Sequence, residues 1–420
     1  MKLGLTKYGK TARSSVHGLT IGVATLTLGL LTTSAAEAKG PYVTLRDDGT
    51  LSNKISGPAT ALEKVIKQYD AAGQPRPDVI SVWTAFSQNK NDVETLYLPA
   101  SNDVTGIGLD EVYGGDGTFD DDGYAPLKAV LLHNNILAMK KRADLTHAPV
   151  EGFAEYLFLL ELSHVWGPSV KNEGLLGFPF HWSFWMDAGG SPAGGNKWKD
   201  NGDGTFSVLP QAPKDMTYSM LDLYLMGLAD PSEVEPFGLL ENAEPPPDVL
   251  DPYTGKELAA SSFPHFDSTA VKVKATRKTI TIDDIIATNG TRTPARKDAP
   301  KKLKLGIVLM VGATADEAAV AKAEATMDPI ANALAPAFER ATRGRGQLEV
   351  VTKSVEATPD PEGEPTPGEG EPAVNPTPNE TSSTSESGCT VSAHPTSTGV
   401  LSLVGLVAAA LVRRRRARAR

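Results

Sequence analysis

Residues 356–388 restrict what this 420-residue chain can fold into. Pro, Glu, Thr, Ser and Gly dominate this segment, as in the run Pro359-Asp360-Pro361-Glu362-Gly363-Glu364-Pro365. Because such a composition buries little apolar surface and its acidic groups repel one another, we expect an extended linker rather than a fold. A packed body is therefore confined to residues 39–355, between this linker and the N-terminal segment 1–38.

The N-terminal segment has the three-part layout of a secretory signal peptide. Residues 1–17 carry four cations and no acid, an apolar stretch runs from Leu19 to Leu31, and Ala36-Glu37-Ala38 forms a small-x-small cleavage pattern. The alternative is a transmembrane anchor, but the apolar stretch is short for a bilayer core of about 30 Å. We therefore predict export, with removal of residues 1–38.

Composition limits the function of the body. A hydrophobic fraction of 40% supports a packed core. The formal net charge is −10 although both ends of the chain are basic, so the body between them is more acidic still and repels nucleic acid. The single cysteine excludes an intramolecular disulfide and a cysteine-rich zinc module.

The C-terminal residues combine a cysteine, a short apolar run and a block of arginines. Gly388-Cys389 ends the linker, residues 399–412 are apolar or small, and Arg413 begins the cationic block. The apolar run is short for an untilted membrane span, and the arginines favour the cytoplasmic face. The alternatives are a tail-anchored protein with an incidental cysteine and a processed sorting signal.

This order of elements over residues 388–420 resembles the C-terminal sorting signals of myxobacterial surface proteins, the MYXO-CTERM type. The resemblance implies that Cys389 is the processing or anchoring site and that the outer-envelope sorting machinery is a partner. It also implies an exported protein at the cell surface or outer membrane, tethered through its C-terminal tail.

Hydrophobic patterns in the body predict an α+β fold. Residues 60–69 have helical periodicity, residues 78–86, 94–98 and 128–133 have strand character, and residues 153–166 form a Gly- and Pro-free, largely buried helix. This order predicts a mixed sheet packed on the buried helix. The second half is expected to be loop-rich and helical, with loops over 167–217, a strand at 304–311, and a helix at 316–327 followed by a separate helix from Asp328-Pro329.

The segment Leu160-Glu161-Leu162-Ser163-His164 lies in the predicted buried helix. Zinc peptidases carry His-Glu-x-x-His on such a helix, where the two His side chains bind the metal and the Glu polarises the metal-bound water. Here Leu160 stands in place of the first His. A Glu-x-x-His pair alone is also compatible with a simple contact inside a helix.

Further motifs extend the pattern, namely His181-Trp182-Ser183-Phe184-Trp185-Met186-Asp187 and Tyr218-Ser219-Met220-Leu221-Asp222-Leu223-Tyr224-Leu225-Met226-Gly227. With the helix, they make residues 150–345 resemble exported zincin-like metallopeptidases. The resemblance implies a zincin-like fold, Glu161 as catalytic base, and His164 as metal ligand. His181 is a candidate ligand outside the helix, or else a histidine packed among aromatic rings. Tyr218, Asp222 and Tyr224 are candidates for orienting a ligand or an oxyanion, or else make structural hydrogen bonds, and Met226 is either a floor below the metal or core.

Leu160 separates two functional hypotheses. A catalytic zinc has three protein ligands and an open position for water, and Leu supplies no lone pair. Zinc binding is therefore expected to be impaired, so that the chain is either a zinc-dependent peptidase with residual activity or a pseudoenzyme. In the second case the aromatic-rich former substrate cleft binds a peptide, a protein or envelope material without catalysis.

Two acidic turns are compatible with calcium. They span residues 115–122 and 200–205, and neither has the spacing and terminal Glu of an EF-hand loop. The alternative is that both are solvated turns in which Asp side chains bond to their own backbone.

Overall fold

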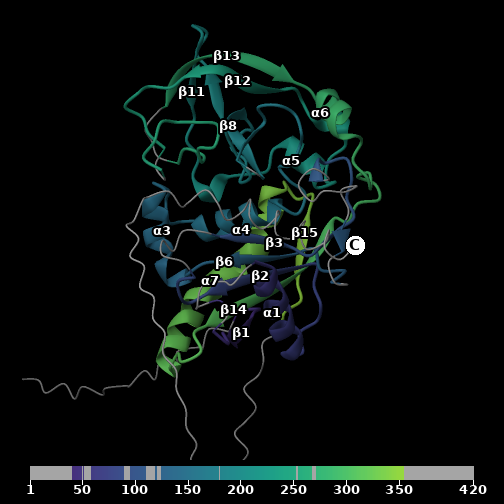
Figure 1. Ribbon diagram of the computed structural model, residues 1–420, viewed down its shortest axis with the longest axis vertical. Helices are drawn as coiled ribbons and strands as arrows, with labels where there is room; N and C mark the ends of the chain where they lie inside the picture. The colour runs from purple at the N-terminus through teal and green to yellow at the C-terminus, as the bar shows by residue number, and fades with distance from the viewer. Residues whose placement is uncertain are drawn as a thin grey trace, which may run out of the picture. The chain divides into compact units, whose positions relative to one another are not determined.

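The computed structural model describes residues 40–49, 51, 58–88, 95–109, 119–120, 124–178, 180–251, 254–266 and 271–353. The predicted signal peptide, the linker, the C-terminal sorting signal with Cys389 and most of the acidic turn at 115–122 lie outside these ranges. The described chain is an α+β protein with two main sheets (Figure 1).

We call the two sheets inner and outer. The inner sheet contains β1 (Val43–Arg46), β2 (Val79–Thr84), β3 (Leu96–Pro99), β6 (Ala129–His133), β14 (Lys302–Val311) and β15 (Gln347–Val350). The outer sheet contains β7 (Leu176–Phe178), β8 (His181–Asp187), β9 (Gly194–Asn196), β10 (Trp198–Asp200), β11 (Thr205–Val208), β12 (Phe237–Glu244) and β13 (Lys272–Ile280). A separate pair joins β4 (Ser101–Asn102) to β5 (Phe119–Asp120).

Among the described helices, α7 is the longest, with 25 residues. The α-helices are α1 (Pro58–Ala71), α3 (Met139–Leu145), α4 (Phe153–Ser163), α5 (Met220–Leu225), α6 (Ile282–Asn289) and α7 (Glu317–Ala341), and the 3₁₀ turns are η1 (Ile136–Ala138), η2 (Pro213–Asp215) and η3 (Pro231–Glu233). No helix in the described ranges has both the length and the apolar composition needed to cross a membrane.

The inner sheet is parallel except at one edge. Its order is β1-β14-β2-β6-β3, β15 also pairs with β14, and only β3 is antiparallel to its neighbour. Every residue of β2 and β6 is buried, as expected for parallel strands covered on both faces. The predicted mixed sheet is thus confirmed.

Helices cover both faces of the inner sheet. In β14, Val308 and Met310 pack in one cluster with α1, whereas Ile307 and Leu309 pack in the cluster that contains α4 and α7. This alternation follows from the two-residue period of a strand. The buried helix predicted at 153–166 is α4, which contacts β3 and β6 of the inner sheet as well as α7.

Two predictions about the second half are wrong. Residues 167–217 hold five strands of the outer sheet rather than loops, because Trp182 and Met186 in β8 point into the main core and Phe184 packs in a second cluster inside the outer sheet. In addition, α7 runs unbroken through Pro329 and Pro336. Its buried side chains, which include Met327 and Leu334, pack in the main core on both sides of these prolines and hold the helix together.

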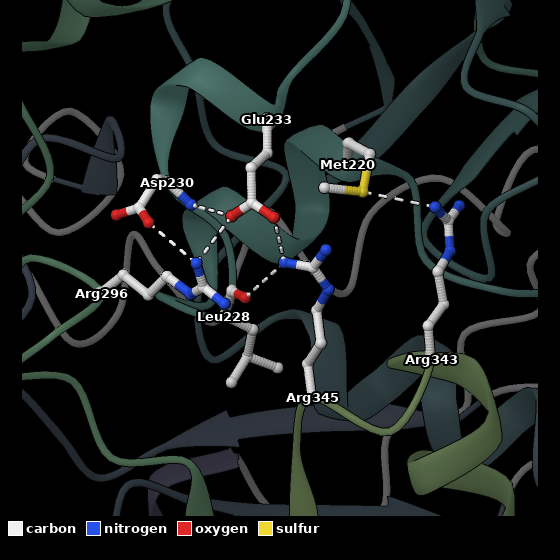
Figure 2. Close-up of polar contacts among 7 residues, drawn as sticks. All are labelled: Met220, Leu228, Asp230, Glu233, Arg296, Arg343 and Arg345. Atoms are coloured by element: carbon white, nitrogen blue, oxygen red, sulfur yellow. Dashed lines mark hydrogen bonds and ion pairs between the residues drawn. The ribbon is translucent and has the colours of Figure 1, made fainter.

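An ion-pair cluster joins the segment after α5 to the turn before β15 (Figure 2). The Glu233 carboxylate accepts from Arg296 Nη1 at 2.9 Å, from Arg345 Nη1 at 2.7 Å and from the Asp230 backbone N–H at 2.8 Å. Arg296 also pairs with Asp230 at 2.8 Å, and Arg345 donates to the Leu228 carbonyl at 3.2 Å. The cluster therefore fixes where the chain enters β15.

The last described residues are held by side chains as well as by β15. Lys353 N–H donates to Gln74 Oε1 at 2.9 Å, and Gln74 Nε2 donates to the Lys353 carbonyl at 3.0 Å. Thr352 Oγ1 accepts from the Ile307 N–H at 2.5 Å. The side-chain amide of Gln74 thus makes the pair of hydrogen bonds to Lys353 that the backbone of a neighbouring strand would make.

Candidate functional site

The helix α4 carries Glu161 and His164 at its C-terminal end. It begins after Gly152, whose φ of 76° lies in the left-handed region that favours glycine. There is also no room for a side chain at this position, because a Cβ would lie 2.5 Å from the side chain of Lys214. Glu161 lies in the last turn and His164 is the C-terminal cap. Glu161 Oε2 and His164 Nε2 are 4.0 Å apart, and both side chains are almost fully buried.

His181, the first residue of β8, meets His164. The two ring centroids are 4.9 Å apart with an angle of 75° between the planes. Tyr97 from β3 and Phe180 each lie edge-on to His164 with centroids at 5.7 Å. The structure therefore brings Glu161, His164 and His181 together from two elements, among aromatic rings.

Burial dominates the electrostatics of these side chains. Burial raises the pKa of Glu161 to about 7, although a hydrogen bond from the Thr95 hydroxyl and the charge of Arg142 oppose this shift. Burial also lowers the pKa of His164 well below its usual value, and the neighbouring His181 lowers it further. Near neutral pH the site thus contains a carboxyl group that can exchange a proton beside an uncharged imidazole.

Leu160 occupies the position of the missing first ligand. Its side chain is 5% exposed and packs in an apolar cluster with Phe153, Tyr156, Leu157, Met216 and Phe266. Glu161 could become a third donor through Oε2, since Thr95 bonds to Oε1, but it would then no longer be free to act as a base. This donor set does not fit a catalytic zinc with three protein ligands. In the described part of the chain, no group of three or more His, Cys, Asp and Glu side chains is arranged to hold a metal ion.

Tyr218 and Asp222 make hydrogen bonds to the two elements that carry the site, α4 and β8. The Tyr218 hydroxyl donates to the Leu159 carbonyl in α4 at 2.6 Å. Asp222 Oδ1 accepts from Trp182 Nε1 at 2.7 Å, and Trp182 adjoins His181 in β8. Both side chains therefore make hydrogen bonds to the two elements of the site. A role for either in orienting a ligand or an oxyanion stays a prediction.

Tyr224 and Met226 are bonded or packed elsewhere. The Tyr224 hydroxyl accepts from the Arg292 backbone N–H at 3.1 Å, and Met226 is part of the main core. Neither side chain joins the contacts described for Glu161, His164 and His181.

Three polar residues near the site were not foreseen from the sequence. Thr95 bonds to Glu161, Arg142 is fully buried and donates to the Asn134 carbonyl at 3.3 Å, and His133 is fully buried. His133 stacks on Trp83 at 4.0 Å, and among the described residues neither of its ring nitrogens has a hydrogen-bond partner. Burial lowers its pKa. The sequence indicated only that His133 would be buried, because it ends a strongly apolar predicted strand.

A small hollow adjoins His181. It is lined by His181, Trp182, Gly194 and residues 260–264. The Phe263 ring lies edge-on to His181 with centroids at 5.9 Å. The hollow lies between β8 and the segment that crosses it.

The acidic turn at 200–205 binds its own backbone. Asp200 Oδ1 accepts from Gly202 N–H at 2.8 Å, and Asp203 Oδ1 accepts from Thr205 N–H at 3.1 Å. Lys272 pairs with Asp203 at 3.5 Å. These are the local bonds expected of solvated Asp turns, and calcium binding here stays a prediction.

Fold and site together define an α+β protein with a buried glutamate and two adjacent histidines between its sheets. Comparisons with protein-family models, with curated proteins and with solved structures found no match for the chain.

Proposed function

We propose that this chain is a surface-tethered homologue of the zincin metallopeptidases in which zinc binding is impaired. One observation carries the proposal: Glu161, His164 and His181 meet in one place, while Leu160 is packed in an apolar cluster. A peptidase ancestor accounts for the grouping, and the substitution at position 160 accounts for the missing third donor.

A second candidate function is non-catalytic binding of a peptide or protein at the same place. It is favoured by the rings of Tyr97, Phe180 and Phe263, which surround the two histidines, and by the hollow beside His181. Aromatic side chains supply large contact areas at low entropic cost in binding sites. In this reading Glu161 and His164 are relics of the ancestral site, and His181 lines the hollow.

Restoring the ligand tests the zincin assignment. We expect Leu160→His to bind one zinc ion per chain, and to do so about a thousandfold more tightly than the wild type, because a metal ligand contributes several kcal/mol and each 1.4 kcal/mol is a factor of ten. Zinc content of the purified protein and competition with a chelator measure this. Leu157→His is the matched control, because Leu157 lies in the same cluster but one turn too early to pair with His164.

Activity is the second readout of the same variant. The Leu160→His protein should cleave unstructured peptides, and adding Glu161→Gln should abolish cleavage while leaving zinc bound. If folded Leu160→His binds zinc no better than Leu157→His, the zincin assignment is wrong. Wild-type protein that neither binds zinc nor cleaves, but loses affinity for an extended peptide on Phe263→Ala, supports the binding function.

A further inference from the structure

One segment links the two elements that carry the site. We call residues 259–266 the strap. It starts at the outer sheet beside β7 and β8, passes over His181, and ends against α4. Its two ends are held in different ways.

The first end of the strap is held between backbone atoms. The Ala260 carbonyl accepts from the Phe184 N–H in β8 at 2.9 Å, and a Cβ on Gly177 of β7 would lie 1.6 Å from the same carbonyl oxygen. Ser262 turns back onto this end, because its N–H donates to the Ala259 carbonyl and its hydroxyl accepts from the Ala259 N–H, each at 3.0 Å. The end at Ala260 therefore has little room to move unless the sheet itself moves.

The second end is held by side chains. The His265 N–H donates to Asn196 Oδ1 at 3.1 Å, and Phe266 packs with Leu160 and Tyr156 in one apolar cluster. The rings of Phe266 and Tyr156 meet edge-on, with centroids 5.1 Å apart. Side chains can change rotamer while strands keep their ladder bonds. This end can therefore be released by a local opening that leaves both sheets intact.

The middle of the strap covers His181. The hollow described above has residues 260–264 on one side and His181, Trp182 and Gly194 on the other. The Phe263 ring lies edge-on to His181 with centroids at 5.9 Å. The hollow thus separates the middle of the strap from the floor formed by β8 and β9.

The site is closed in the structure. The side chains of Glu161 and His164 are almost fully buried, and His181 is the least buried of the three. A peptide that reaches them therefore requires part of the molecule to move. The strap is the described segment that touches His181 and α4 together.

We propose that the strap is a lid over the site, hinged near Ala260 and held shut at its other end by Phe266 in the cluster of Leu160. Lifting that end takes Phe263 off His181 and opens the hollow to a ligand. The leucine that replaces the first metal ligand thus also helps to keep the site closed. The proposal rests on the proposed function, since a lid needs a ligand to admit, but its opening is measured without ligand or metal.

Hydrogen exchange of the purified protein, followed residue by residue at increasing urea concentrations, tests the opening. The His265 amide should exchange through a local opening, at a rate that hardly depends on urea. After correction for intrinsic rates, it should exchange at least about a hundredfold faster than the Phe184 amide at the hinge, which should exchange only when the body unfolds. A His265 amide with the same rate and urea dependence as the Phe184 amide would overturn the proposal.

A substitution at the second end tests the link to the site. Phe266→Leu keeps an apolar side chain but loses the ring contact with α4, so it should speed both His265 amide exchange and carbethoxylation of His181 by the same factor, about tenfold. The exposed His147 is the internal reference for carbethoxylation. Phe153→Leu, in the same cluster but outside the strap, is the matched control and should leave both rates within about twofold.

The lid and the zincin assignment can fail separately. The zinc affinity of Leu160→His reports on the metal site, whereas exchange and carbethoxylation are measured without metal. If Phe266→Leu speeds exchange at His265 but leaves the His181 rate unchanged, the strap moves without uncovering the site and the proposal is overturned. Equal effects of Phe266→Leu and Phe153→Leu also overturn it. If Phe266→Leu does not fold, the comparison of His265 with Phe184 in the wild type decides.

Discussion

At the scale of single residues, burial controls the chemistry of Glu161 more than its partners do. Thr95 and Arg142 both favour the ionised form, yet the pKa is raised to about 7. A carboxyl group removed from water prefers to be neutral unless strong donors compensate. Glu161 thus stores an electrostatic penalty that folding must overcome at neutral pH.

Replacing Glu161 with Gln should release this penalty. The pKa of Glu161 is about 7 in the folded protein, compared with 4.5 for a glutamate in water, which stands for the unfolded chain. The folded state therefore binds the proton more tightly, so this contribution to stability is complete below pH 4.5 and is lost as the pH rises through 7. The wild type should therefore lose up to about 3 kcal/mol between pH 4.5 and 8 that Glu161→Gln does not lose. Urea unfolding at several pH values measures this, with Glu155→Gln on the same helix as control. A wild-type curve parallel to that of Glu161→Gln would contradict the prediction.

Removing the Tyr218 hydroxyl should weaken the support of α4. Tyr218→Phe removes the hydroxyl that donates to the Leu159 carbonyl at 2.6 Å, and the loss of this buried hydrogen bond costs about 1 kcal/mol. Denaturant unfolding should show an unchanged slope and a lower midpoint. An unchanged midpoint would mean that water or another donor replaces the hydroxyl.

The sequence predicted the site in part because motif spacing encodes chemistry within one helix. Glu161 and His164 are one turn apart, so their proximity follows from helical geometry. The meeting of His164 with His181 rested on a resemblance, and the structure shows the contact. Thr95 and Arg142 were not foreseen, because their approach depends on how β3 and α3 pack against α4 and no local pattern encodes that packing.

At the scale of elements, tertiary packing decided where local signals failed. The prolines in α7 favoured two helices, but apolar side chains on both sides of them pack in one core. The Gly- and aromatic-rich stretch at 167–217 suggested loops, yet two of its strands, β8 and β11, pair with β12 and β13, more than fifty positions away. Elements with strong periodicity, such as α1, β2, β6 and β14, were predicted correctly because both faces of the inner sheet are covered.

The contact between β7 and the crossing segment 259–264 should be intolerant of any side chain. A Cβ on Gly177 would lie 1.6 Å from the Ala260 carbonyl oxygen, a backbone atom that cannot turn aside. Gly177→Ala should therefore lower Tm by several degrees and increase amide exchange in residues 259–264. Gly312→Ala, where nothing lies within 4 Å, is the control. Equal Tm values for the two variants would contradict the prediction.

At the scale of the whole molecule, the two sheets share one core. A single cluster of buried side chains includes Leu131 and Leu309 of the inner sheet, Trp182 and Met186 of the outer sheet, and Phe158 of α4 between them. Separation of the sheets would expose this cluster. The described body should therefore unfold as one unit.

Calorimetry measures that cooperativity. The ratio of calorimetric to van 't Hoff enthalpy should be close to one. Fluorescence of the tryptophans in the outer sheet and far-UV circular dichroism should give the same midpoint. Two resolved transitions would show that the sheets are separate folding units.

If the protein is tethered through its C-terminal tail, as we propose, the hydrogen bonds between Gln74 and Lys353 determine where a force on the tail enters the body. Tension from residues beyond 353 enters through Gln74 and Thr352 and passes to β14 beside β15. In the strand order, this margin is opposite to β3, whose Tyr97 contacts His164. We expect such a force to act first at this margin of the inner sheet, on the opposite side from β3 and its contact with His164.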